Sequence, residues 1–335
     1  MKKDNISVCY VYRSKNVSYS IERVFERIRL AMNRAVVQSE VYCPSNKYRN
    51  PFSYIKNALA TRKCKADIYH ITGVVHYIAL FFSRNKTIIT VHYLGHIFNT
   101  KGIVGFFLRL IFAYLPLRWS KNIVAISQFS KDEIVEKVGI PAEKISVIYD
   151  PAPEEFKYTP RKIDLEKPRI LSFCHLPNKN LARIIESLSG INCHLRIIGK
   201  LSEEYLNLLE KYKIEYSNCF NIPSQQILDE YKQCDFLLFP STYEGFGVPI
   251  LEAQLTGRPV ITSNIAPMTE VAGESAILVN PFDVTSIKEG IQKLLASEDF
   301  AYNLIELGLE NAKRFDCNII SNQYLDLYKK ILNKH

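Results

Sequence analysis

The chain has 335 residues, of which 47% are hydrophobic and 23% charged, and this composition excludes a disordered, collagen-like or low-complexity protein. At about 100–200 residues per domain, the length predicts two globular domains. The net charge of +9 is uneven, because residues 1–150 carry +13 and residues 151–335 carry −4. The basic first half predicts an anionic partner or surface met by the first domain only, with nucleic acid and acidic lipid as the candidates.

Eight cysteines are scattered along the chain without a Cys-x-x-Cys pair or a spacing typical of zinc ligands. We expect them to be mostly buried thiols of a reducing compartment. The first apolar run, Ile6–Tyr12, is too short for a signal-peptide core, and no stretch reaches 18 uncharged apolar residues. The sequence therefore predicts a cytoplasmic protein without a membrane-spanning segment.

Short apolar runs alternate with amphipathic stretches through the first half of the chain. Strands are predicted at Ile6–Tyr12, Val41–Tyr42, Asp67–Ile71, Thr87–His92, Ile123–Ser127 and Ile145–Tyr149. Ser130 and Glu133 form a capping-box pattern that predicts the start of a helix. The segment Asp150–Lys167 is rich in proline and charge and has no clear periodicity, so it predicts a linker.

The same alternation resumes after this segment. Strands are predicted at Arg169–Cys174, His194–Gly199, Asp235–Pro240, Pro259–Ser263 and Ala276–Asn280. Their hydrophobicity is continuous, which is typical of parallel sheets covered on both faces. The pattern predicts an α/β protein with two doubly wound domains facing a central cleft. We expect an N-terminal domain over residues 1–160, a C-terminal domain over 161–315, and a final helix over 316–335 that packs back toward the N-terminal domain.

Residues 239–260 combine a buried strand, a loop with two glycines and the start of a helix. Gly245 and Gly247 let the backbone approach a ligand, and the free N–H groups at the helix start favour a phosphate. Glu244 precedes this turn and Glu252 lies one turn inside the helix, so two carboxylates flank the phosphate site and suit hydroxyls of a sugar and a ribose. The alternative is a tight strand–turn–helix with one solvated and one capping glutamate.

This segment resembles the Glu-x7-Glu signature of family 4 glycosyltransferases of the kind that build bacterial surface polysaccharides. The resemblance continues through residues 263–283, which look like the family's next strand, helix and strand. Upstream, Pro177–Leu181 resembles its Arg-Lys-Asn loop, and Thr87–His92 resembles the strand that ends in its pocket histidine. The match covers nearly all of residues 120–315.

The resemblance implies the GT-B fold, a nucleotide-sugar donor in the second domain, an acceptor in the first, retention of anomeric configuration and no required metal or other cofactor. It assigns Lys179 to the donor diphosphate, Glu244 to the transferred sugar, Glu252 to the ribose and His92 to the sugar from the first domain. On spacing alone, His92 is equally a buried core histidine. Further donor contacts are implied for His175, Gly245, Phe246, Gly247 and Val248.

The chain departs from the family pattern at several positions. Tyr93 follows the pocket histidine, where the family usually has Asp. The glycine-rich turn after the first strand is replaced by Ser14–Ser18, in which Asn16 and Ser18 are the candidate acceptor-side residues. Asp150 begins an Asp-Pro pair where an interdomain Asn-Gly is expected. These departures affect donor affinity and acceptor geometry rather than the fold.

A second feature is the apolar run Ile103–Trp119, which has Arg109 and Arg118 toward its margins. The run is too short and too charged to span a membrane. It is either a core helix of the first domain or an interfacial helix that dips into lipid headgroups. A lipid-linked glycan acceptor would explain the second alternative.

Together these observations predict a glycosyltransferase that moves a hexose from a nucleotide-diphosphate sugar to a glycan acceptor, lipid-linked, in the synthesis of lipopolysaccharide O-antigen, capsule or a related polysaccharide. We expect it to be peripheral on the inner face of the cell membrane. An epimerase of the same architecture, which needs no acceptor, is the first alternative. A nucleic-acid-binding protein is a remote one, since no recognition-helix motif occurs. The absence of Asp-x-Asp disfavours a metal-dependent transferase.

Overall fold

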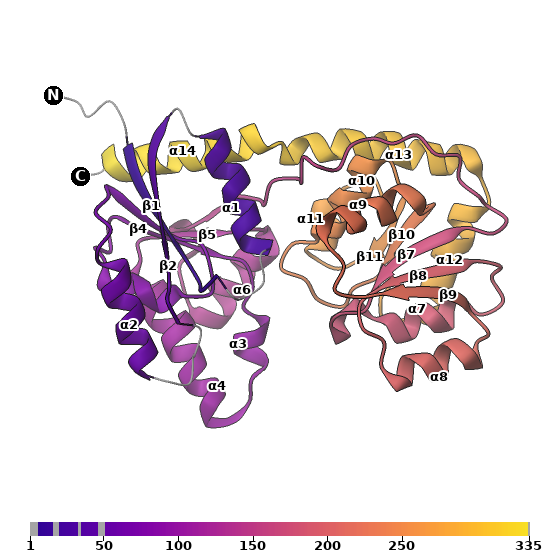
Figure 1. Cartoon of the computed structure of the whole chain (residues 1–335), viewed down its shortest axis with the longest axis horizontal. Coiled ribbons are helices and arrows are strands. Elements are labelled where there is room, and N and C mark those ends of the chain that lie inside the picture. The colour runs from indigo at the N-terminus through magenta and orange to yellow at the C-terminus, as the bar shows by residue number, and fades with distance from the viewer. Residues whose placement is uncertain (1–5, 16–19, 33–34, 46–50, 334–335) are drawn as a thin grey trace. The chain divides into compact units, whose positions relative to one another are not determined.

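The computed structural model describes residues 6–15, 20–32, 35–45 and 51–333, and it divides into two compact units (Figure 1). Unit 1 comprises Met1–Pro151 with Asp316–His335, and unit 2 comprises Ala152–Phe315. The division therefore falls earlier than the boundary expected at residue 160.

Unit 1 is built on a parallel sheet of six strands in the order β2-β1-β3-β4-β5-β6. The strands are β1 (Ile6–Tyr12), β2 (Val36–Tyr42), β3 (Ile68–Ile71), β4 (Thr87–Val91), β5 (Asn122–Ala125) and β6 (Ile145–Val147). All six predicted strands are confirmed. The edge strand β2 begins before the predicted Val41, because the polar residues Gln38, Ser39 and Glu40 interrupt its apolar run in the sequence.

The helices of unit 1 surround this sheet. They are α1 (Ser20–Ala31), α2 (Pro51–Thr61), α3 (Gly95–Asn99), α4 (Gly102–Arg109), α5 (Leu115–Trp119), α6 (Gln128–Val138) and α14 (Cys317–Asn333), with short helical turns η1 (His76–Phe81), η2 (Leu110–Tyr114) and η3 (Ala142–Lys144). The prediction that Ser130 begins this helix is wrong, because the helix begins one turn earlier. The N-cap of α6 is Ser127, whose hydroxyl accepts the N–H of Ser130 at 3.0 Å.

The last helix, α14, packs on the sheet of unit 1 (Figure 1). Tyr324 and Tyr328 of this helix are fully buried. The ring of His70 on β3 lies between two partners, with Nδ1 2.7 Å from the hydroxyl of Tyr328 and Nε2 2.7 Å from the hydroxyl of Thr90. A buried polar chain thus joins the C-terminal helix to the middle of the sheet.

Unit 2 has a second parallel sheet of six strands, in the order β12-β11-β10-β7-β8-β9. The strands are β7 (Arg169–Phe173), β8 (His194–Ile198), β9 (Glu215–Cys219), β10 (Phe236–Phe239), β11 (Val260–Ser263) and β12 (Ile277–Val279). The five predicted strands are confirmed. The sequence analysis missed β9, because this edge strand is half exposed and its sequence is largely polar.

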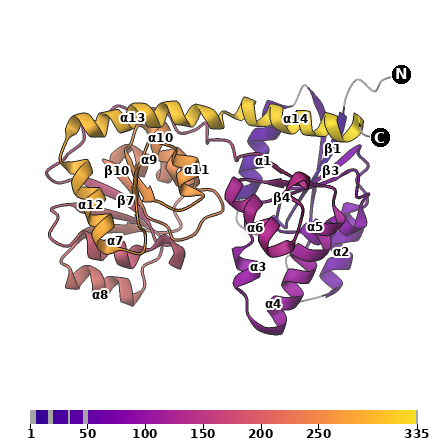
Figure 2. The ribbon, with the colours of Figure 1, turned by 180° about the vertical axis from the view of Figure 1, so that it is seen from behind.

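Helices cover both faces of this sheet (Figure 2). They are α7 (Leu181–Ser187), α8 (Glu203–Lys211), α9 (Ser224–Gln233), α10 (Val248–Thr256), α11 (Met268–Ala272), α12 (Val284–Leu295) and α13 (Glu298–Ala312), with short turns η4 (Pro177–Lys179) and η5 (Lys313–Phe315). Helix α7 packs with α8 and α12, whereas α10 packs with α9, α11 and α13. Unit 2 is therefore a three-layer α/β unit.

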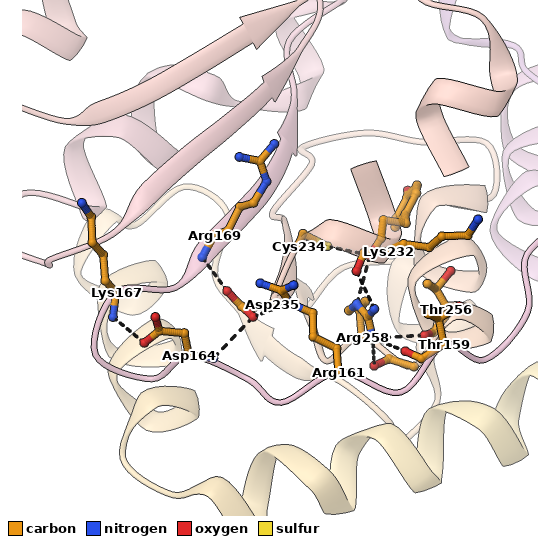
Figure 3. Close-up of polar contacts among 12 residues, drawn as sticks. Thr159, Arg161, Asp164, Lys167, Arg169, Lys232, Cys234, Asp235, Thr256 and Arg258 are labelled. Atoms are coloured by element: carbon orange, nitrogen blue, oxygen red, sulfur yellow. Dashed lines mark hydrogen bonds and ion pairs between the residues drawn. The ribbon is translucent and has the colours of Figure 1, made fainter. Parts of the chain in front are cut away.

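Two buried charges hold the segment before β7 against unit 2 (Figure 3). The guanidinium of Arg258 donates to the carbonyl oxygen of Thr159 at 3.0 Å. The carboxylate of Asp235 accepts from the backbone N–H of Arg169 at 2.7 Å and from the guanidinium of Arg161 at 2.9 Å. The stretch predicted as a linker is thus bound to unit 2 over much of its length, which explains the earlier boundary.

Cys9 on β1 and Cys64 beyond the end of α2 form a disulfide. The sequence predicts mostly buried thiols, and this pair is an exception to that prediction. Nothing in the sequence shows that β1 meets the end of α2, because the two cysteines are 55 residues apart. The other six cysteines lie outside this disulfide, and five of them are buried.

The apolar run forms one continuous helical stretch, Gly102–Trp119, made of α4, η2 and α5. Its 18 residues are long and apolar enough to cross a membrane by length and composition, so the expectation that the run is too short is wrong on that measure. Only 28% of it is buried. Phe112, Ala113 and Leu117 belong to the core of unit 1, whereas Ile103 is exposed. The run is therefore part core and part surface.

Candidate active site

The carboxyl ends of β7 and β10 lie side by side in the sheet of unit 2. From β7 the chain proceeds to β8 and β9 on one side, whereas β10, β11 and β12 lie on the other. The loops after β7 and β10 therefore diverge, and open α/β sheets bind ligands at such a point. Lys179 lies in the loop after β7 and Glu244 in the loop after β10.

The loop after β7 is fixed by Asn180, a buried residue with a left-handed backbone conformation (φ 64°). Its side-chain amide donates to the carbonyl oxygen of Pro240 at 3.0 Å and to that of Pro281 at 2.6 Å. These bonds tie the loop to the ends of β10 and β12. Asn is among the few residues that tolerate this conformation, and it positions the neighbouring Lys179.

Lys179 and Glu244 form an ion pair, with 2.6 Å between Nζ and Oε1. Their side chains are 6% and 15% exposed. The same Oε1 lies 2.6 Å from the hydroxyl of Ser241 and 3.3 Å from the side-chain nitrogen of Asn178. The ammonium also lies over the ring of Phe239, 4.7 Å from its centroid. A mostly buried cation and carboxylate are thus held at one point by neighbouring loops.

Helix α10 begins at Val248, shortly after Glu244 in the sequence and where the glycine and proline pattern predicts. Gly247 is its N-cap with φ 118°, a conformation that strains any residue with a side chain. The first N–H groups of a helix have no intrahelical partner and attract anions. The ring of Phe246 is buried against Phe315, so only the backbone of Phe246 is available to a ligand.

Glu252 lies one turn inside α10 and accepts a hydrogen bond from the hydroxyl of Tyr231 at 2.8 Å. Burial raises the pKa of Tyr231 well above its usual value, and the Glu252 carboxylate raises it further. The tyrosine therefore keeps its proton and holds the carboxylate in place. The sequence analysis missed Tyr231, because a tyrosine on the buried face of α9 carries no motif.

His175 also lies in the loop after β7. Partial burial lowers its pKa and the ammonium of Lys179 lowers it further, whereas the carboxylate of Glu244 opposes both effects. The backbone at Gly199 approaches closely, because a Cβ atom there would lie 2.9 Å from the backbone nitrogen of His175. His175 is thus a neutral imidazole at pH 7 beside the Lys179–Glu244 pair.

The remaining candidates belong to unit 1. His92 follows β4 and is 9% exposed, and its Nδ1 lies 3.6 Å from a carboxylate oxygen of Asp150. Its Nε2 has no hydrogen-bond partner among the residues that the structure describes. At the position after His92, where the family usually has Asp, this chain has Tyr93. Asp150 nevertheless places a carboxylate beside the histidine. Asn16 and Ser18 lie outside the described residues.

Two family models match the chain, one in each half. The model "Glycosyltransferase Family 4" matches residues 10–155, and the model "Glycosyl transferases group 1" matches residues 155–310. Together the two matches extend over nearly all of both units.

Mannosyltransferases are among the curated relatives of the chain. The serotype-specific mannosyltransferase WbdA of Escherichia coli is 29% identical over 217 residues, which are 58% of this chain and 27% of WbdA. O-antigen chain mannosyltransferase B of Escherichia coli is 27% identical over 233 residues, 63% of this chain and 61% of the relative. The matched region thus spans from about a quarter to three-fifths of the length of these relatives.

Solved structures of similar fold match nearly the whole chain. Anabaena HepE, crystallised with UDP and glucose, has a TM-score of 0.75 at 14% identity, and the match covers 97% of this chain and 100% of HepE. WaaG, a glycosyltransferase involved in lipopolysaccharide biosynthesis, has a TM-score of 0.72 at 15% identity and coverages of 96% and 99%. At such identities the likeness shows the fold alone, and it confirms the predicted GT-B fold.

Proposed function

Because the chain belongs to the family 4 glycosyltransferases, we propose that it transfers a hexose from a nucleotide-diphosphate sugar to a lipid-linked glycan acceptor. The product belongs to lipopolysaccharide O-antigen, capsule or a related polysaccharide. The observation that carries this proposal is the Lys179–Glu244 pair at the point where the loops of unit 2 diverge, with Glu244 shortly before the start of α10. One carboxylate, one ammonium and a helix N-terminus together suit a sugar attached to a diphosphate.

In this proposal, Lys179 and Glu244 give up their ion pair when the donor binds, and each takes a group of the donor as its new partner. The diphosphate takes the ammonium of Lys179, and this releases Glu244 for the hydroxyls and the developing positive charge of the sugar. Ser241 and Asn178 keep the carboxylate in position after the exchange, since both contact the same oxygen. Glu252, held by Tyr231, binds the ribose hydroxyls.

Transfer breaks the bond between the anomeric carbon and the diphosphate oxygen, and the oxygen of the acceptor hydroxyl forms the new bond on the same face. Because the new bond forms on the face from which the diphosphate departs, the anomeric configuration is retained. The acceptor hydroxyl gives its proton to the departing diphosphate. Lys179 and the N-terminus of α10 stabilise the charge of the departing diphosphate, so the reaction needs no metal ion.

Unit 1 is proposed to bind the acceptor. The buried Nε2 of His92, which has no hydrogen-bond partner among the described residues, supports a ligand contact within unit 1, because a buried ring nitrogen usually has a partner. The Asp150 carboxylate beside Nδ1 orients the ring.

The activities for which the relatives are named guide the choice of substrates. Several are mannosyltransferases of O-antigen, and a Campylobacter jejuni relative, 25% identical over 209 residues, is named for a diphospho-undecaprenol acceptor. A lipid-linked acceptor places the enzyme on the cytoplasmic face of the cell membrane as a peripheral protein, and the charge of +13 on residues 1–150 supports this location.

The test is a transfer assay with UDP-, GDP-, ADP- and dTDP-hexoses and an undecaprenyl-diphosphate-linked glycan. We expect one donor to release its nucleoside diphosphate only when the acceptor is present, and the new linkage to keep the donor's anomeric configuration by NMR. Conversion of the donor to its epimer without an acceptor would instead establish an epimerase. An inverted product would contradict retention.

A further inference from the structure

Five buried polar side chains form one hydrogen-bonded cluster between the sheet of unit 1 and α14. We refer to them as the His70 cluster: Tyr10 on β1, His70 on β3, Thr90 on β4, and Tyr324 and Tyr328 on α14. Each is at most 1% exposed. Burying polar groups costs free energy unless they are bonded, and groups that are bonded fix positions that apolar packing leaves freer.

The hydrogen bonds run in one direction through the His70 cluster. The hydroxyl of Tyr328 donates its proton to that of Tyr10 at 3.3 Å, so its oxygen accepts from Nδ1 of His70, 2.7 Å away. Nε2 of His70 then carries no proton and accepts from the hydroxyl of Thr90 at 2.7 Å. The oxygen of Thr90 is left to accept from the hydroxyl of Tyr324 at 3.4 Å. The cluster therefore holds a neutral His70 with its proton on Nδ1.

The bond between Thr90 and His70 holds β4 beyond the point where its backbone pairs with β3. The last pair of that ladder is Ile71 with Ile89, so Thr90 is the next residue along β4. His92 follows two residues later, just after the end of the strand. The side chain of Thr90 thus ties β4 to β3 immediately before the histidine.

Phe25 on α1 connects the same cluster to the ring of His92. Its centroid lies 4.9 Å from that of His70 and 5.8 Å from that of Tyr324. The ring of His92 meets Phe25 edge to face, with 5.9 Å between centroids and 78° between planes. A shift of His70 or Tyr324 would therefore reach His92 through Phe25, because close-packed rings move together.

Asp150, which lies beside His92, is also close to the cluster. Burial raises the pKa of Tyr324, the hydrogen bond to Thr90 lowers it, and the carboxylate of Asp150 raises it again. That carboxylate is itself buried, and one of its oxygens lies 3.6 Å from Nδ1 of His92. The cluster thus adjoins His92 in three ways: through β4, through the ring of Phe25 and through the carboxylate of Asp150.

We propose that the His70 cluster positions the ring of His92, so that Tyr324 and Tyr328 of the C-terminal helix are positioning residues for the ligand contact of unit 1. They touch no reacting atom. They act by fixing β4 and Phe25, against which the histidine packs. This role rests on the ligand contact proposed for His92 and deepens it. Without the two hydroxyls, α14 would still cover the sheet but would no longer fix the histidine.

The experiment compares variants of the full chain, labelled with ¹⁵N-histidine, by NMR without substrates. Thr90→Val, Tyr324→Phe and Tyr328→Phe each remove one hydroxyl and nearly keep the shape of the side chain. Each should shift the ring-nitrogen signals of His92, which His92→Gln identifies by their loss. In the wild type, His70 should carry its proton on Nδ1.

Transfer kinetics measure the consequence of this positioning. Thr90→Val should lower kcat about tenfold and each tyrosine variant about threefold, because a small displacement of a contacting group slows the reaction. Donor Kd should change less than about twofold, since the groups proposed for the nucleotide and the diphosphate lie in unit 2.

Two control variants separate positioning from general stability. Thr90→Ser keeps the hydroxyl and should match the wild type both in kcat and in the signals of His92. Tyr77→Phe removes another buried hydroxyl of unit 1, which accepts from the side-chain amide of Asn57 at 2.7 Å and packs in a different part of the core. It should destabilise the protein without shifting the signals of His92.

Several results would overturn the proposal. Unchanged His92 signals in Thr90→Val and Tyr328→Phe would do so, as would an equal shift in Tyr77→Phe or a wild-type His70 protonated on Nε2. Normal kcat in Thr90→Val, in an enzyme that His92→Gln impairs, would also contradict it. Normal kcat in His92→Gln would instead refute the ligand contact proposed for His92, and the NMR comparison would still decide whether the cluster positions the ring.

Discussion

Units 1 and 2 are each built on a six-stranded parallel sheet of their own. They differ in where their polar and titratable groups lie. In unit 2 the ion pair of Lys179 and Glu244 lies in loops at the carboxyl ends of two strands. In unit 1 the fully buried His70 and His76 lie beneath the surface and bond to other parts of the same unit. In unit 2 the sheet thus brings two loops together at a candidate site, whereas in unit 1 the histidines of β3 and η1 make interior contacts.

The largest expected effect concerns Glu244, the carboxylate of unit 2 that we propose contacts the transferred sugar. Glu244→Gln should lower kcat by ~10²–10³-fold, because it removes the charge that stabilises the transition state. Donor Kd should change much less, since Lys179 remains. Steady-state kinetics and calorimetric titration measure the two quantities. Glu274→Gln, an exposed glutamate of the same unit, serves as the control. Near wild-type turnover in Glu244→Gln would refute the assignment.

Low pH should decrease the unfolding free energy of unit 1, because its buried histidines take up protons only when it unfolds. Burial lowers the pKa of His70 to about 3 and that of His76 to about 4, so both stay neutral in the folded protein while they take up protons near pH 6.5 when unfolded. Stability is therefore complete above pH 6.5 and is lost as pH falls toward these values. Between pH 7 and pH 5.5 the two together should remove about 2.5 kcal/mol of unfolding free energy.

Hydrogen exchange of the sheet amides of unit 1, corrected for the intrinsic pH dependence, measures this loss. His70→Gln should flatten the dependence by about half, because one of the two histidines no longer titrates. A pH dependence of the same slope in His70→Gln would show that other groups cause it, and the contrast between the units would then need another origin.

Smaller effects on donor binding are expected from Glu252 and Tyr231, which we assign to the ribose. Glu252→Gln should raise donor Kd about tenfold, because the charged acceptor of a hydrogen bond is lost. Tyr231→Phe should raise it less, about threefold, since the carboxylate remains but loses the donor that holds it. In both variants kcat should stay close to that of the wild type. A fall in kcat without a change in Kd would move Glu252 from the ribose to the reacting sugar.

The smallest effect predicted is that of removing metal ions. Activity should change less than about twofold in EDTA, since Lys179 and the N-terminus of α10 stabilise the departing diphosphate. The comparison is made with the same enzyme after Mg²⁺ is added back. Abolished activity that Mg²⁺ restores would contradict the assignment of these groups.

The sequence predicted those features of both units that depend on local patterns. Continuous apolar runs predicted eleven strands, and the glycine and proline pattern predicted the start of α10. The polar edge strand β9 gave no such pattern. Contacts between distant segments were also missed, namely the disulfide of Cys9 with Cys64, the position of Asp150 beside His92 and the bond from Tyr231 to Glu252. Each depends on which loops the sheet brings together, and no spacing in the chain encodes that.

The central claim is that a nucleotide sugar binds in unit 2 with its diphosphate on Lys179. A thermal-shift panel of UDP-, GDP-, ADP- and dTDP-sugars tests it on the full chain, because a donor that binds the folded state raises Tm by mass action. We predict that at least one of them raises the Tm of the wild type and of the exposed control Lys211→Met, and that the rise is nearly abolished in Lys179→Met. A panel without any shift, or an equal shift in Lys179→Met, would contradict the account.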